Sequence, residues 1–291
     1  MNRPSLIILC GIPGSGKTTY AKKYISEYPK TPVHLSSDKI REELYGDETI
    51  QSNPSEVFAL MQKRAIEALN DGHDVLYDAT NVTRKDRAGI IGACPKFAKI
   101  ECHIIWAPIE TCIERDASRD RTVGKEVIDR MLKRFQAVYY DEGIDEIKIV
   151  RPDDFNAMKY MCDHWERMEI PHDNPHHTLD ILHHCWKSKI YITKRCSNLD
   201  LSVAAEWHDM SKPYVKSFND AKGNPSECAH YYQHQAVSAW ESYGLPKITP
   251  YSSWLISTHM ESFFNSKYYK NLPPFLKKDI DLLHEADLAA H

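Results

Sequence analysis

The sequence lacks four features that would each point to a particular class of protein. No apolar run approaches the length of a membrane span, and Met1 to Ser5 lead into a short strand rather than a signal peptide. Basic residues are not in excess, because 37 Lys and Arg stand against 41 Asp and Glu. None of the eight cysteines belongs to a C-x-x-C pair. These absences argue against a membrane protein, a disulfide scaffold and a strong non-specific nucleic-acid binder.

The composition is that of an ordinary globular protein, but its histidines are unevenly distributed. The 291 residues are 42% hydrophobic and 27% charged, which allows one or two domains with a sizeable core. Of fifteen histidines, only His34, His73 and His103 precede residue 160. The two halves of the chain are therefore expected to carry different chemistry.

Residues 11–18, Gly-Ile-Pro-Gly-Ser-Gly-Lys-Thr, match the pattern G-x-x-x-x-G-K-[ST] at every fixed position. An apolar run of strand length precedes them at 6–10, and residues 19–24 can continue them as a helix. Glycines let several N–H groups face one anion, and the helix N-terminus adds partial positive charge. Lys17 is expected to reach the terminal phosphates of ATP, and the Thr18 hydroxyl to hold Mg²⁺. The predicted ATP site consists of Gly11, Pro13, Gly14, Ser15, Gly16, Lys17 and Thr18.

Strand and helix patterns alternate up to about residue 152. Strands are predicted at 6–10, 33–37, 74–77, 99–106 and 147–150, and helices at 19–24, 40–45, 55–69, 85–94, 109–119 and 126–140. This alternation predicts an α/β domain over residues 1–152, with a parallel sheet covered by helices on both faces. Ligands of such sheets bind at the carboxyl ends of the strands. The phosphate loop, Asp38 and Asp78 all follow strands, which supports one shared active site.

Polar residues after the second and third strands are candidates for binding and catalysis. Asp38 could take a proton from an attacking hydroxyl, and Arg41, on the same helix face, could bind an acceptor phosphate. A helix N-cap is the alternative explanation of Asp38. Asp78 and Asn81, within Asp-Ala-Thr-Asn, could assist Mg²⁺ or the substrate, or could cap the strand end.

A pair of arginines precedes a loop at 120–124. Arg115 and Arg119 are four residues apart on a predicted helix, and arginines on a mobile flap neutralise the charge of a transferring phosphoryl group. A solvated basic face, paired with Glu114 and Asp116, is the alternative.

Together these stretches resemble the small P-loop kinases of the polynucleotide 5′-hydroxyl kinase group. The matching pieces are residues 11–18, Ser-Ser-Asp-Lys-Ile-Arg at 36–41, residues 78–81, Arg115 with Arg119, and Val-Ile-Asp-Arg-Met at 127–131. The resemblance implies that Asp38 is the general base that activates a 5′-OH. It also implies that Arg41 binds the acceptor-side phosphate and that the arginine pair binds the donor phosphates.

Beyond a boundary at residues 151–154, helical patterns dominate. Helices are predicted at 179–191, 200–209, 230–243, 252–260 and 276–290, which gives an all-α domain over residues 153–291. Adjacent His208 and Asp209 can both reach one metal if further ligands converge on them. The candidates are His177, His184, His230, His234, His259 and Asp287. A mixed histidine and aspartate set favours Mn, Fe, Co, Ni or Mg over structural zinc, although any single histidine can be an ordinary core or surface residue.

This half of the chain resembles the HD phosphohydrolase superfamily. The matching stretches, in family order, are residues 174–184, Trp-His-Asp-Met-Ser-Lys-Pro at 207–213, and residues 232–235, 258–259 and 285–287. The resemblance implies that one metal is held by His184, His208, Asp209 and Asp287. It implies that His234 and His259 could hold a second metal, with Asp209 bridging, and that Lys212 could contact phosphate. His177, His183 and His230 are weaker matches.

Three functions are compatible with these two sites. The first is an end-healing enzyme for nucleic acids, RNA more than DNA. Its kinase phosphorylates a 5′-OH, and its HD domain removes a 3′-phosphate or a 2′,3′-cyclic phosphate, which produces the ends that a ligase requires. The second is a nucleoside or nucleotide kinase fused to a nucleotidase, which the near-neutral charge favours. The third is a non-catalytic nucleotide-sensing switch. With an ATP site present, the scattered cysteines indicate reduced thiols and a cytoplasmic protein without a membrane partner.

Overall fold

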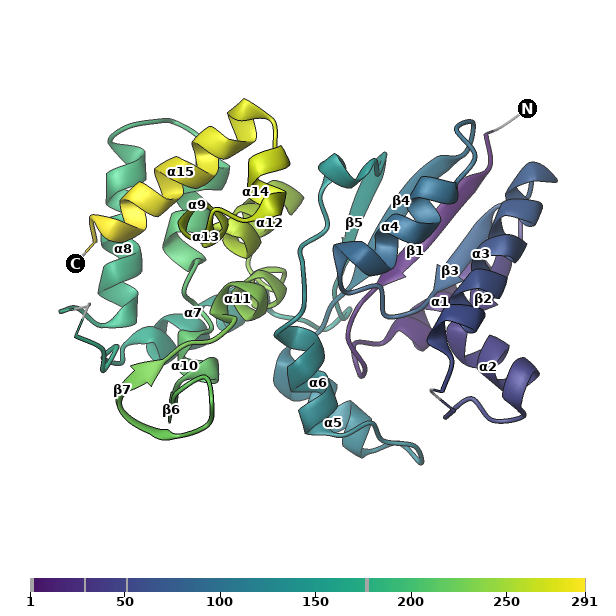
Figure 1. Cartoon of the computed structure of the whole chain (residues 1–291), viewed down its shortest axis with the longest axis horizontal. Helices are drawn as coiled ribbons and strands as arrows, with labels where there is room; N and C mark the ends of the chain where they lie inside the picture. The colour runs from purple at the N-terminus through teal and green to yellow at the C-terminus, as the bar shows by residue number, and fades with distance from the viewer. Residues whose placement is uncertain (1–2, 29, 51, 176–177, 291) are drawn as a thin grey trace. The chain divides into compact units, whose positions relative to one another are not determined.

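The structure is a computed structural model that describes residues 3–28, 30–50, 52–175 and 178–290. The chain forms two compact units (Figure 1). The first consists of Met1–Ile128 and Val138–Pro152, and the second of Asp129–Ala137 and Asp153–His291. Residues 129–137, which the sequence analysis assigns to the first domain, thus group with the second unit. None of the described helices is both long and apolar enough to cross a membrane.

A five-stranded parallel sheet forms the centre of the first unit, as the alternating pattern predicts. The strands, in the order β2-β3-β1-β4-β5, are β1 Ser5–Cys10, β2 Val33–Ser36, β3 Val75–Asp78, β4 Lys99–Ile105 and β5 Glu146–Val150. Every residue of the central strand β1 is buried. Asp78 pairs in register with Leu9 of β1 and with Ser36 of β2. The loops that follow β1, β2 and β3 therefore begin at the same edge of the sheet.

The helices of this unit lie close to their predicted positions. They are α1 Lys17–Glu27, α2 Ser37–Tyr45, α3 Pro54–Asn70, α4 Arg84–Ala93, α5 Ile109–Ala117 and α6 Lys125–Leu132, with a 3₁₀ turn, η1, at Tyr140–Glu142. In α3, Val57, Met61, Ala65 and Leu69 recur at helical spacing and are buried. α4 begins with a capping box in which Thr83 and Asp86 each accept the backbone N–H of the other.

The helix predicted at 126–140 is wrong in its second half, because α6 ends at Leu132. The N–H of Phe135 closes a tight turn onto the carbonyl of Leu132 at 3.0 Å. The ring of Phe135 then packs edge-to-face against Trp240 of the second unit, with ring centroids 5.4 Å apart. This tertiary contact overrides the local helical pattern.

The second unit is mainly helical. Its helices are α7 Ala157–Met168, α8 Ile181–Thr193, α9 Leu199–Trp207, α10 Lys212–Val215, α11 His234–Ser242, α12 Pro250–Thr258, α13 Glu261–Phe264, α14 Lys267–Asn271 and α15 Pro274–Leu288. α8 packs against α9 and α15, and α12 packs against α9 and α11 (Figure 1). Trp240 and Trp254 are fully buried in this core.

The prediction of an all-α second domain is wrong at one place, where a hairpin pairs β6, Ser217–Asn219, with β7, Pro225–His230. The Asp220 carboxylate accepts the N–H groups of Lys222 and Asn224, both at 2.8 Å, and Gly223 adopts a φ of 86°. This turn chemistry favours a hairpin. His230 therefore ends a strand, and the helix predicted to start there begins at His234.

A buried ion pair joins α4 to η1 in the first unit. Arg87 donates through Nε and Nη2 to the Glu142 carboxylate at 2.7 Å each, and through Nη1 to the carbonyl of Asn81 at 2.9 Å. Arg87→Met leaves the buried Glu142 carboxylate without its cation, so we expect the first unit to lose about 3–5 kcal/mol of stability. This loss can be measured by urea unfolding, with hydrogen exchange of the sheet amides as the readout.

The exposed pair Lys63–Glu67 on α3 provides the control. Lys63→Ala is expected to change the stability of the same unit by less than about 1 kcal/mol. Similar losses for the two variants would contradict a special role for the buried pair.

Candidate active sites

The phosphate loop lies between β1 and α1, and its glycines are required by space and by backbone conformation. Gly14 and Gly16 have φ angles of 80° and 102°, values that only glycine adopts without strain. A Cβ on Gly14 would lie 2.1 Å from the backbone oxygen of Cys112. The loop is therefore closely packed under α5.

Lys17 is partly buried at the start of α1. Its ammonium donates to the carbonyl oxygens of Gly11 and Ile12, at 2.8 and 2.9 Å. Burial lowers the pKa of Lys17, and the negative charge of Asp78 partly opposes this shift. Phosphate oxygens could replace the two carbonyl oxygens as acceptors, because an ammonium is a compact donor on a flexible stem.

Two carboxylates stand at the ends of β2 and β3. Asp38, in the first turn of α2, has a half-exposed side chain and forms an ion pair with the buried guanidinium of Arg41 at 2.7 Å. Asp78 accepts from His34 Nε2 at 3.1 Å, a partner that the sequence analysis does not find. The two carboxylates thus follow neighbouring strands of the sheet.

Asn81 adopts a φ of 46° just beyond β3. Its amide nitrogen donates to the carbonyl of Leu9 at 2.7 Å, which attaches the loop to β1. Its buried Oδ1 atom has no hydrogen-bond partner among the described residues. The amide nitrogen is thus committed to the fold, and only the oxygen is available to a ligand.

The predicted arginine pair is arranged differently from the prediction, because α5 ends at Ala117 and Arg119 lies in the turn beyond it. A Cβ built on Gly16 would lie 3.7 Å from Arg115 Nη1, so this guanidinium lies beside the phosphate loop. The positive charge of Arg119 contributes to the lowered pKa of Lys17. Both arginines are therefore near the loop.

The alternative partner of those arginines has a different role. Asp116 is buried, and its carboxylate accepts the N–H groups of Val123 and Gly124 at 3.0 and 2.9 Å. It closes the 118–124 loop and does not pair with an arginine in the part of the chain that the structure describes. Arg121 in that loop donates to Glu48 at 2.7 Å.

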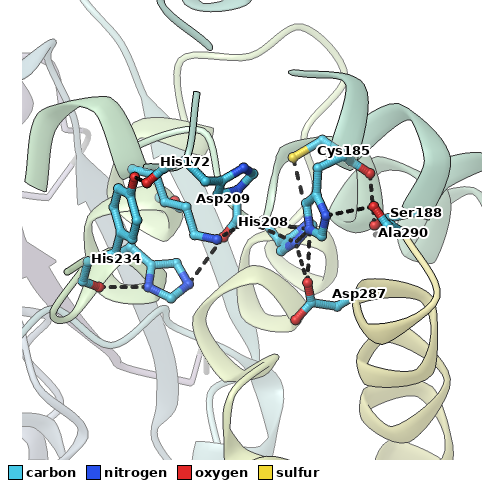
Figure 2. Close-up of polar contacts among 12 residues, drawn as sticks. His172, Cys185, Ser188, His208, Asp209, His234, Asp287 and Ala290 are labelled. Atoms are coloured by element: carbon cyan, nitrogen blue, oxygen red, sulfur yellow. Dashed lines mark hydrogen bonds and ion pairs between the residues drawn. The ribbon is translucent and has the colours of Figure 1, made fainter. Parts of the chain in front are cut away.

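Six predicted metal ligands converge in the second unit. They form two groups in which the candidate ligand atoms lie within 4.8 Å of one another: His184, His208, Asp209 and Asp287, and Asp209, His234 and His259. In the first group, His184 Nε2 lies 2.9 Å from Asp287 Oδ1 and 3.3 Å from His208 Nε2. In the second, His234 Nε2 lies 3.2 Å from Asp209 Oδ1 and 3.1 Å from His259 Nε2. Figure 2 shows four members of these groups, His208, Asp209, His234 and Asp287, gathered in one region.

The outer nitrogens of these imidazoles are all bound to backbone carbonyls. His184 Nδ1 lies 3.2 Å from Ala290 O, and His208 Nδ1 lies 2.9 Å from Ala205 O. His234 Nδ1 lies 2.9 Å from Tyr231 O, and His259 Nδ1 lies 2.8 Å from Ile256 O. A carbonyl only accepts, so each Nδ1 carries a proton, and each Nε2 faces inward, where it is the atom whose lone pair a metal would bind. Pairs of lone pairs 3.1–3.3 Å apart repel unless a cation lies between them. The donor set therefore fits one or two divalent metals of the type that imidazole and carboxylate prefer.

Charge in the cluster centres on Asp209. Burial acts to raise the pKa of Asp209, but His208 and Lys212 outweigh it and hold that pKa well below its usual range. Lys212 Nζ lies 2.6 Å from Asp209 Oδ2. Asp209 in turn holds the pKa of His208 well above normal against burial, so a metal has to displace a proton there. Burial, with neighbouring positive charge, lowers the pKa of His259 to about 3, which keeps this ring neutral.

Other histidines of this unit have different surroundings. His183 is exposed and bonds to Asp180 at 2.7 Å, and His230 bonds to the Ser226 hydroxyl at 3.0 Å. His172 is buried with its ring 5.3 Å from that of His184, and burial lowers its pKa to about 4. No pattern in the sequence distinguishes His172 from its neighbours. His177 lies outside the described residues.

The chain shares features with several known proteins. Residues 6–138 match the model of a family described as AAA domain. A chain of the Pnkp1/Rnl/Hen1 complex is 26% identical over 40% of each chain, with a TM-score of 0.37. A chain of the Pnkp1/Rnl/Hen1 RNA repair complex is 24% identical over 46% of this chain and 44% of that one, with a TM-score of 0.42. A gluconokinase from Sinorhizobium meliloti 1021 is 14% identical over 53% and 86% of the two chains, with a TM-score of 0.38.

The chain spans less than half the length of the two repair-complex chains. The glycine loop between β1 and α1, the parallel sheet and the match over residues 6–138 give the first unit a P-loop kinase-like fold. The second unit adds a helical scaffold with a buried histidine and aspartate cluster.

Metal content tests this cluster directly. We expect the purified chain to retain a divalent transition metal, and His208→Ala to lower the bound metal by at least about tenfold, as loss of a ligand does elsewhere. His183→Ala is the matched control, because His183 neighbours His184 in sequence but faces Asp180. Elemental analysis after dialysis measures the difference in bound metal. Equal metal content in the two variants would contradict the assignment of His208 as a metal ligand.

Proposed function

We propose that this chain is a bifunctional nucleic-acid end-healing enzyme that acts on broken RNA. Its first activity is an ATP-dependent 5′-OH polynucleotide kinase, and its second is a metal-dependent 3′-phosphatase or 2′,3′-cyclic phosphatase. One observation carries the proposal: a chain with a phosphate loop and a nearby Asp–Arg pair also holds a separate, buried set of metal-type donors. Two phosphate sites with opposite chemistry suit the two ends of one break.

The kinase step assigns a role to each residue near the phosphate loop. Asp38 takes the proton of the 5′-OH while the oxygen of that hydroxyl forms a bond to the γ-phosphorus of ATP. The bond between the γ-phosphorus and the β–γ bridging oxygen breaks at the same time and releases ADP. Arg41 holds the phosphate next to the acceptor and orients Asp38 through their 2.7 Å contact. Lys17, Arg115 and Arg119 neutralise the charge of the transferring group. Thr18 holds Mg²⁺, with Asp78 and Asn81 on the nucleotide side.

The second activity belongs to an HD-type phosphohydrolase in this proposal. His184, His208, Asp209 and Asp287 would hold one metal, and His234 with His259 would hold a second that shares Asp209. Such metals supply a water of lowered pKa and neutralise phosphate charge. Lys212, 2.6 Å from Asp209, orients that carboxylate and is the cation available to a phosphate oxygen.

The partners and the location follow from this chemistry. Its products, a 5′-phosphate and a free 3′-hydroxyl, are the ends that a nucleic-acid ligase joins, so a ligase acts downstream. Chains of RNA repair complexes are among those that share features with this one. Because all eight cysteines are free thiols and the ATP site needs intracellular nucleotide, the enzyme is assigned to the cytoplasm.

The two activities should be lost separately. With an RNA that carries a 5′-OH and a 2′,3′-cyclic phosphate, plus ATP, Mg²⁺ and Mn²⁺, Lys17→Ala should abolish 5′ phosphorylation and keep 3′ processing. His208→Ala should do the reverse, and both ends can be followed on one labelled oligonucleotide. Phosphorylation of free nucleosides alone would favour a nucleoside kinase fused to a nucleotidase, a reading that the net charge of −4 supports.

The base assigned to the kinase has its own test. Asp38→Asn should lower the rate of phosphoryl transfer by about 10²–10⁴-fold while ATP still binds, because only proton removal is lost. Glu43→Gln is the control on the same helix, since Glu43 bonds to Arg64 on the surface. A full rate in Asp38→Asn would argue for the helix-cap role, or for a nucleotide-sensing switch without catalysis.

A further inference from the structure

A segment rich in lysine and aromatic residues separates the last two parts of the metal-type cluster. Residues 262–278, between His259 and Asp287, contain four lysines and five aromatic residues but no Asp or Glu, in a chain of net charge −4. The segment forms α13, α14 and the start of α15, which pack together beside the cluster helices (Figure 1). We call residues 262–278 the lysine–aromatic segment. Its local charge is opposite to that of the chain as a whole.

The aromatic residues of this segment divide into anchors and exposed rings. Tyr268 accepts the indole N–H of Trp254 at 2.9 Å, and Tyr269 donates to Asp281 at 2.6 Å, so these two side chains hold the segment in place. Phe263 and Phe264 are 62% and 64% exposed, with ring centroids 5.1 Å apart. Burying such rings is favourable, and their exposure in pairs is typical of a binding surface.

These rings lie close to the metal-type cluster. Phe263 follows His259 by four residues, which limits their Cα separation to about 14 Å. The ring of Phe263 is also 6.0 Å from that of His284. His284 and Asp287 are three residues apart on α15, so they share a helix face. A group stacked on Phe263 would therefore lie toward the face of α15 that carries His284 and Asp287.

We propose that Phe263 and Phe264 form a stacking platform for a base near the 3′ end of a single-stranded nucleic acid whose terminal phosphate enters the His–Asp cluster. The exposed Lys267 and Lys270 contact its phosphates. A flat ring with lysines beside it matches how single strands are bound without sequence preference: bases stack and phosphates pair with cations. The inference rests on the proposed phosphohydrolase function and specifies its substrate class.

The test compares a short single-stranded RNA ending in a 2′,3′-cyclic phosphate with the corresponding cyclic mononucleotide, using the full metal-loaded chain. Removing one stacked base contact costs about 5- to 150-fold in affinity. In the double variant Phe263→Ala/Phe264→Ala, kcat/KM for the RNA should fall by at least about tenfold more than kcat/KM for the mononucleotide. Phe263→Tyr should retain most of the RNA activity, because a phenol also stacks.

Phe275→Ala is the matched control, since Phe275 is 67% exposed on the same segment but lies at the opposite end of α15 from Asp287. It should leave both substrates within about twofold of wild type. Equal losses on RNA and mononucleotide in the double variant would overturn the platform, as would an RNA activity that remains intact. Intact RNA activity with lost binding of another protein would reassign the surface to a protein partner.

Direct binding separates failure of the platform from failure of the proposed function. Anisotropy of a 5′-labelled RNA lacking any terminal phosphate needs no hydrolysis, and the double variant should weaken its binding by about 5- to 150-fold. RNA binding that depends on both phenylalanines, without 3′ processing, would refute the phosphohydrolase and keep the platform. Processing of RNA 3′ ends without RNA binding that depends on both phenylalanines would support the phosphohydrolase and refute the platform.

Discussion

The second unit depends on one buried carboxylate. Asp209 lies within 3.6 Å of His184, His208 and His234, and Lys212 forms an ion pair with it at 2.6 Å. These residues come from α8, the end of α9, α10 and α11, so four segments depend on the same negative charge. A buried carboxylate is costly to leave without a compensating charge. The core around it therefore holds these donors close together, an arrangement that could bind a divalent cation.

Much of the first unit can be predicted from local sequence. The order of strand, glycine loop and helix identifies the phosphate site, because few backbones turn several N–H groups toward one point. The five parallel strands follow from the alternation of patterns, and the ends of β1, β2 and β3 lie at one edge because the strands are parallel. The roles of Asp38, Arg41, Arg115 and Arg119 remain proposals. The structure adds that Arg115 lies beside the phosphate loop and that Asp38 forms an ion pair with Arg41.

Other features depend on contacts between distant residues, which no local pattern encodes. The helix predicted at 126–140 stops at Leu132 because Phe135 packs on Trp240, more than 100 positions away. The β6–β7 hairpin is short and polar, so it lacks the alternating apolar pattern that would predict strands between the flanking helices. For the histidines, the sequence does not predict which way each side chain points. His183 and His184 are neighbours in the chain, yet one faces Asp180 on the surface and the other faces Asp287.

The histidines that follow α9 and α12 also terminate those helices. His208 and His259 each come directly after the last helical residue, and each ring donates to the carbonyl three residues earlier, Ala205 and Ile256. Helices end with carbonyls that lack a partner within the helix, and these two imidazoles satisfy one each. A metal that pulls on Nε2 polarises the ring and strengthens the Nδ1–H donor. Metal binding in the proposed centre would therefore be coupled to the stability of two helix ends, and metal loss would weaken the last turns of α9 and α12.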